Sequence, residues 1–117
     1  MIITRLELVE LLNLLSDEIN LKILSYIKIY EELCVCQFED ILEIPQPTIS
    51  RHLKALYTAR IISVRKEGRW HYYRLKKLPD FVHEVLNLAM ERYNITREKL
   101  LKRCNTSKQL KNNFPRN

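Results

Sequence analysis

The sequence contains a single glycine, Gly68, and only four prolines among 117 residues, which disfavours tight turns and favours long helices. No apolar run reaches about 18 residues, so we expect no membrane-spanning helix. The first residues lack the charged, apolar and small-residue zones of a secretory signal, and we therefore expect a cytoplasmic protein. A chain of this length fits one domain with its own core.

Cysteine is scarce, with Cys34, Cys36 and Cys104 as the only three thiols. An odd number of cysteines in a reducing compartment argues against a disulfide framework. Cys34 and Cys36 form a Cys-x-Cys pair, and thiols grouped so closely indicate metal or redox chemistry. The alternative is that these cysteines are buried as small apolar residues.

The net charge of +6 is distributed unevenly. Residues 1–44 carry three basic and nine acidic side chains, whereas residues 45–75 carry seven basic side chains and one acidic. Residues 76–117 carry ten basic and four acidic side chains. A polyanion would therefore meet the middle of the chain and be repelled by its beginning. The alternative is a solvated basic surface that binds nothing.

Apolar residues at helical spacing predict five helices, the first four at about 4–15, 17–30, 36–42 and from 46 onward. The first is apolar around much of its circumference and must be covered on more than one side. Two strands follow, joined by a turn at Glu67-Gly68 in which glycine supplies the positive φ. The fifth helix is predicted to run from about 81 to Cys104, where the domain (1–104) ends. The basic tail, 105–117, is predicted to be disordered.

This order of elements predicts a winged helix-turn-helix: a mainly α fold with five helices and a two-stranded β-hairpin wing. A helix that enters the major groove needs short polar side chains near its N-terminus, to reach base edges. The wing tip and the rest of that helix would hold phosphates, which position the protein on DNA. The predicted base-reading residues are Gln46, Thr48, Ser50 and Arg51, and the predicted phosphate contacts are His52, Lys54, Lys66 and Arg69.

Three stretches resemble the ArsR/SmtB family of metal-responsive repressors: 32–36 (ELCVC), 46–53 (QPTISRHL) and 65–74 (RKEGRWHYYR). The stretch 15–24 (LSDEINLKIL) is similar to the family's second helix, although Asn20 stands where arginine is usual. The resemblance covers about residues 6–90. It implies a regulator rather than an enzyme. It also implies a homodimer, held by the first and fifth helices, that binds double-stranded operator DNA without a cofactor and releases it on metal binding.

The family resemblance places a metal site at Cys34 and Cys36. Soft thiolates suit As(III), Sb(III), Cd(II), Pb(II) and Zn(II). Glu39 stands where some members have a third cysteine, so Cys104 or a small-molecule thiol would complete the site. The chain can supply at most three sulfur ligands to this site. This number favours As(III) or Sb(III) as the inducer, because Cd(II) and Zn(II) prefer about four ligands. The family's other site, on the fifth helix, is missing because His83 has no second histidine after it.

Side chains two positions apart on a helix point about 200° apart. Cys34 and Cys36 are therefore expected to hold one ion only if the backbone bends, which would distort the start of the third helix. A redox sensor that uses the same thiols, a Cd(II)-, Pb(II)- or Zn(II)-responsive repressor and a pure interaction module remain alternatives. A thiol enzyme such as an arsenate reductase is disfavoured, because Glu39 and Asp40 would repel an oxyanion.

Overall fold

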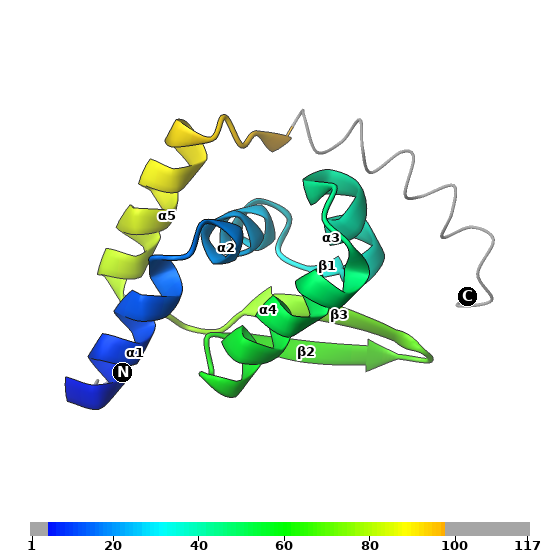
Figure 1. Cartoon of the computed structure of the whole chain (residues 1–117), viewed down its shortest axis with the longest axis horizontal. Helices are drawn as coiled ribbons and strands as arrows, with labels where there is room; N and C mark the ends of the chain where they lie inside the picture. The colour runs from blue at the N-terminus through cyan, green and yellow to red at the C-terminus, as the bar shows by residue number, and fades with distance from the viewer. Residues whose placement is uncertain (1–4, 98–117) are drawn as a thin grey trace.

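The computed structural model of the chain describes residues 5–97, and this part contains five α-helices and three β-strands (Figure 1). Their arrangement confirms the predicted winged helix-turn-helix, with a reading helix, α4, followed by a β-hairpin. The elements in chain order are α1 (Arg5–Leu15), α2 (Glu18–Tyr30), β1 (Leu33–Cys34), α3 (Val35–Leu42), α4 (Gln46–Thr58), β2 (Ile62–Glu67), β3 (Trp70–Leu75) and α5 (Asp80–Arg92).

Helix α2 lies at the centre of the core and packs against α1, α4, α5 and β3. Its side chains Ile23, Leu24 and Ile27 are fully buried. The helix begins where Asp17 caps it, since the Asp17 carboxylate accepts a hydrogen bond of 3.0 Å from the backbone N–H of Asn20. The core around α2 is completed by fully buried Phe38, Ile49, Leu56, Ile62, Val82 and Leu86. None of the helices within residues 5–97 is long and apolar enough to cross a membrane.

The sheet has three antiparallel strands in the order β1-β3-β2, rather than the two strands predicted. The additional strand, β1, pairs Leu33 with Tyr73 and Cys34 with Tyr72. Two residues are too few to show the alternation of apolar and polar side chains by which a strand is recognised in a sequence. This strand fixes the backbone of Cys34 to the wing.

The wing turn lies one residue further along the chain than predicted. Glu67 pairs with Trp70 across the hairpin, so Gly68 and Arg69 form the loop. Gly68 has φ +62°, which confirms the predicted positive φ, a conformation that glycine adopts without strain. A Cβ at this position would meet nothing within 4 Å, so the requirement is conformational and not steric crowding.

Helix α5 ends at Arg92, so the predicted helix to Cys104 is wrong. After Tyr93 the chain turns at Asn94, which has φ 54°, and the backbone N–H of Ile95 donates to the carbonyl of Met90 at 2.9 Å. Ile95 is buried at this turn, because the chain folds back onto the core instead of continuing the helix. Cys104 and the predicted tail lie outside the described residues.

Helix α1 presents apolar side chains on two sides. Leu11 and Leu15 are buried against the core, whereas Leu8, Val9 and Leu12 are exposed. On α5, Leu88 is 67% exposed. Both helices lie at the end of the molecule away from the wing tip (Figure 1). The chain on its own therefore leaves the first helix half-covered, as its sequence pattern predicted.

Candidate metal site and DNA-reading surface

The Sγ atoms of Cys34 and Cys36 lie 3.1 Å apart. Cys34 is the N-cap of α3 and has an extended backbone, φ −100° and ψ 168°, whereas Cys36 lies in the first turn of the helix. The prediction that the two side chains point about 200° apart is therefore wrong, because it assumed that both residues were helical. The two sulfurs converge in the structure, and one ion can meet both without any unwinding of α3.

The position of Cys34 is held by its backbone as well as by its thiol, which accepts from the backbone N–H of Gln37 in the capping box of α3. Its backbone N–H donates to the side-chain oxygen of Gln37 at 3.0 Å, and its backbone belongs to the ladder with Tyr72. The Cys34 side chain is 1% exposed, while Cys36 is half-buried. The pair is thus preorganised, with one sulfur inside the protein and the other reachable from solvent.

The thiol pair opens onto a cleft of about 370 Å³ between α3, α4 and the wing. Cys34, Cys36 and Glu39 line one side of it. Three of the predicted DNA contacts, Gln46, Ser50 and Arg69, line the same cleft from the reading helix and the wing tip. The structure therefore brings the sensing thiols and part of the DNA-reading set into one site, although they are separate in the sequence.

The donor set fits a soft ion but is incomplete in the described part of the chain. Within residues 5–97, no group of three or more His, Cys, Asp or Glu side chains is arranged to hold a metal. The two side chains present are thiols, and thiolates are the ligands that As(III) and Sb(III) prefer over oxygen donors. The third ligand predicted from the sequence, Cys104, is outside the described residues.

The first turns of α4 present a row of polar side chains, while Ile49 and Leu53 on its other side are buried. The side-chain amide of Gln46 donates to the Ser50 hydroxyl at 2.6 Å, which orders the start of the helix. The Arg51 guanidinium donates to the Thr48 hydroxyl at 3.3 Å. These four side chains and exposed Lys54 share the solvent side of α4, as a reading helix requires.

His52 differs from the other predicted DNA contacts. Its ring Nδ1 lies 2.8 Å from the side-chain oxygen of Asn20, so it contacts α2 beneath the reading helix. Asn20 is 3% exposed, and its amide also donates to the Leu14 carbonyl at the end of α1, at 2.9 Å. One buried amide thus joins three helices. Sequence reasoning noticed Asn20 only as a departure from the family pattern and missed this role.

We expect Asn20→Ala to lower the free energy of unfolding by about 1–3 kcal/mol, since it leaves the Leu14 carbonyl and the His52 ring without this partner. Urea denaturation followed by circular dichroism measures the change. Asn87→Ala, at an exposed position of α5, is the matched control and should unfold like the wild type. Equal stability of the two variants would contradict the proposed role of Asn20.

The basic side chains of the wing differ in their partners. Arg65 forms salt bridges with two carboxylates, because its guanidinium lies 2.7 Å from Glu32 and 2.8 Å from Glu67. The hydrogen bond from Arg65 holds the pKa of Glu32 below its usual value. Lys66 and Arg69 are exposed at the tip. Two of the four predicted phosphate contacts, Lys54 of α4 and Lys66 of the wing, line one groove of about 240 Å³ between these elements.

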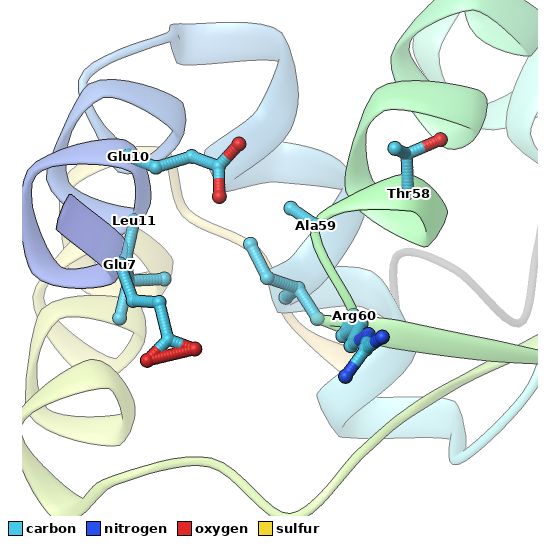
Figure 2. A pocket seen from close by; sticks show the side chains of 7 residues that line it. Glu7, Glu10, Leu11, Thr58, Ala59 and Arg60 are labelled. Atoms are coloured by element: carbon cyan, nitrogen blue, oxygen red, sulfur yellow. The ribbon is translucent and has the colours of Figure 1, made fainter. Parts of the chain in front are cut away.

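A second cleft, of about 230 Å³, lies between α1 and the end of α4. Figure 2 shows Glu7 and Glu10 of α1 on one side of this cleft and Arg60 on the other. It contains none of the predicted site residues. Its two carboxylates would repel a polyanion, so DNA is not expected to bind here.

The fold, the polar reading helix and the basic wing define a winged helix-turn-helix regulator of transcription. Residues 17–64 match the model of the bacterial regulatory proteins of the arsR family. The chain is 41% identical over 78 residues to the arsenic resistance transcriptional regulator ArsR2 of Pseudomonas putida, covering 66% of this chain and 68% of that protein. The arsenical resistance operon repressor of Staphylococcus aureus is 34% identical over 89 residues, or 76% and 79% of the two chains.

Among solved structures, HlyU from Vibrio cholerae is similar with a TM-score of 0.63 and 29% identity, over 74% of this chain and 91% of that one. The chain belongs to the arsR family of bacterial regulatory proteins and is a transcriptional repressor, not an enzyme. This confirms the family resemblance.

Proposed function

We propose that the protein is a dimeric repressor that binds operator DNA in the cytoplasm and releases it when As(III) or Sb(III) binds Cys34 and Cys36. The observation that carries this proposal is the 3.1 Å separation of the two sulfurs at a cleft that Gln46, Ser50 and Arg69 also line. An ion captured there lies beside the DNA-reading residues. The arsenic-related names of the two relatives support the choice of inducer.

The number of available thiolates also favours trivalent arsenic or antimony. Cd(II) and Zn(II) sites contain about four ligands, whereas the whole sequence offers three thiols. The assignment of Cys104 as the third sulfur stays a prediction. Titration of the purified dimer with arsenite, antimonite and cadmium, with thiolate absorption and operator affinity followed together, tests the inducer. Release by cadmium at lower concentration than arsenite would contradict the assignment.

On the DNA side, we expect Arg51→Ala to weaken operator binding by about 1–3 kcal/mol and to relax sequence preference, because a base contact is lost. Lys66→Ala removes a phosphate contact and should weaken binding to all sequences alike. The slope of the logarithm of the binding constant against the logarithm of the salt concentration should become smaller by about one. Fluorescence anisotropy with operator and scrambled DNA at several salt concentrations measures both.

Lys22→Ala on α2 removes a positive charge outside the reading helix and the wing, and serves as the control. Its operator affinity should stay close to that of the wild type. If all three variants lose the same affinity on both DNA sequences, the effect is one of net charge and the proposed reading surface is wrong.

The dimer is proposed to form through α1 and α5. Leu8, Val9 and Leu12 on α1 and Leu88 on α5 are exposed apolar side chains at the end away from the wing tip. A two-fold dimer buries the same surface on both copies and leaves two reading helices for a palindromic operator.

The short distance between the sulfurs also favours a redox response. Oxidation by peroxide would join Cys34 and Cys36 in a disulfide, with two thiols oxidised, peroxide reduced and two waters released. Loss of operator binding with peroxide but not with arsenite would select this second candidate over metal sensing. Release by arsenite with no effect of peroxide would reject it.

A further inference from the structure

His52 on the reading helix is held from inside the protein by Asn20 of α2. Asn20 is 3% exposed, and its side-chain nitrogen donates to the Leu14 carbonyl at 2.9 Å. Because a carbonyl can only accept, this contact determines which end of the Asn20 amide carries the hydrogens. The amide oxygen is therefore the end that lies 2.8 Å from Nδ1 of His52.

The orientation of the Asn20 amide determines the tautomer of His52. An amide oxygen accepts hydrogen bonds and cannot donate, so the single proton of the neutral ring lies on Nδ1. The other ring nitrogen, Nε2, then carries a lone pair and no proton. The phosphate oxygens of DNA are also acceptors, so a neutral His52 has no hydrogen to donate to them.

The Nε2 side of the ring is left for a second partner. The His52 side chain is 20% exposed, although its Nδ1 is engaged with a buried residue. Within residues 5–97, Nε2 takes part in no hydrogen bond. Thr48, one turn earlier on α4, is among the predicted DNA contacts, so the ring lies next to the surface that is expected to meet the operator.

We propose that His52 contacts an operator phosphate only as the imidazolium ion, so that operator binding takes up one proton, and that Asn20 is the positioning residue for this contact. In the bound state Nδ1–H donates to Asn20 and Nε2–H donates to a phosphate oxygen. The second proton comes from solvent. The inference rests on the proposed function and adds a condition to its DNA-binding step. Operator affinity should rise as the pH falls, because only the protonated ring makes the charge-assisted hydrogen bond.

The charged groups on the three helices around the ring are compatible with a cation there. The Asp17 carboxylate lies 3.8 Å from Nδ1 of His52, where it attracts a positive ring and not a neutral one. The others have their own partners or line another surface: Glu18 pairs with Lys22 at 2.9 Å, Arg51 donates to Thr48, and Glu10 of α1 lines the cleft at the end of α4.

Anisotropy of labelled operator DNA between pH 8 and pH 5.5 measures the proton uptake, since histidine side chains change charge in this range. We expect the full chain to bind roughly 10–150-fold more tightly at pH 5.5, the contribution of one hydrogen bond to a charged group. His52→Gln keeps a polar side chain but has no charge to gain, and should lose this pH dependence. His71→Gln removes an exposed histidine of the wing, and as the matched control it should keep the dependence.

Asn20→Ala separates positioning from a purely structural role. Without the amide oxygen, the neutral ring can carry its proton on Nε2 and donate to a phosphate with no added proton. The pH dependence should therefore shrink, whereas simple destabilisation would lower the affinity alike at every pH. Asp17→Asn keeps an oxygen that caps α2 and removes the negative charge. It should bind the operator like the wild type at pH 8 and more weakly than the wild type at pH 5.5.

Three results would overturn the inference: a wild-type affinity that is the same at pH 8 and pH 5.5, a pH dependence that persists in His52→Gln, or one that disappears in His71→Gln. None of them bears on the proposed reading surface, which Arg51→Ala and Lys66→Ala test at a single pH. If those two variants bind like the wild type, the proposed DNA-binding surface fails independently of any effect of pH.

Discussion

Cys34→Ser is expected to leave operator affinity unchanged and to abolish release by arsenite. The hydroxyl is close to the thiol in size and can accept the same capping hydrogen bond from the backbone of Gln37, and the backbone contacts of this residue are unchanged, so the fold should be preserved. A serine hydroxyl is a hard ligand and does not replace a thiolate on As(III). Wild-type protein should lose about 5–150-fold in operator affinity when arsenite binds, the usual range of such coupling, and the variant should lose none.

Anisotropy of labelled operator DNA, with and without arsenite, measures this difference. Cys36→Ser should behave in the same way, since either change leaves one sulfur of the pair. Val35→Ala, between the two cysteines, is the matched control because it alters the same turn and keeps both thiols. Arsenite release that persists in Cys34→Ser would show that the ion is bound elsewhere.

Much of the fold could be predicted because it depends on local patterns. The spacing of apolar residues located all five helices, and Asp17 marked the start of α2 through its capping carboxylate. Gly68 located the wing because it is the one glycine in the chain. The polar row on α4 followed from helical periodicity alone, and the structure places those side chains on one face.

The features that could not be predicted depend on contacts between distant segments. Strand β1 exists because Leu33 and Cys34 pair with β3, about forty residues later in the sequence. The same pairing keeps Cys34 extended, and so brings its sulfur to Cys36. Helical angles do not apply to this pair, because the backbone of Cys34 is set by the sheet and only Cys36 is helical.

His52 illustrates the same limit on the DNA side. Its neighbours Arg51 and Lys54 are exposed, and the sequence grouped all three as DNA contacts. Its ring instead meets Asn20, thirty-two positions earlier, and no local pattern links the two. The reading helix is thus anchored by a residue that resembles a DNA contact in sequence. A phosphate contact by its other ring nitrogen remains a prediction.

Leu12→Glu is expected to convert the dimer into a monomer and to lower operator affinity by about 10²–10⁴-fold, the gain that two linked binding sites give over one. Leu12 is 48% exposed in the single chain, next to Val9 on the outer side of α1. If this side is the dimer interface, the new carboxylates would be buried without partners, which is strongly unfavourable. In a monomer the same carboxylate faces water, so the fold should be retained. Size-exclusion chromatography with light scattering and operator anisotropy measure the two effects.

Asn87→Glu is the charge-matched control for this prediction. Asn87 is exposed on α5 and lies within one turn of Glu84 and Glu91. The new carboxylate is therefore placed among side chains that are already polar and exposed to water. This variant should remain dimeric and bind the operator. Leu12→Glu protein that stays dimeric would place the interface on another surface. A monomer that keeps full operator affinity would instead show that each chain binds DNA alone, and the apolar side of α1 would then need a different partner.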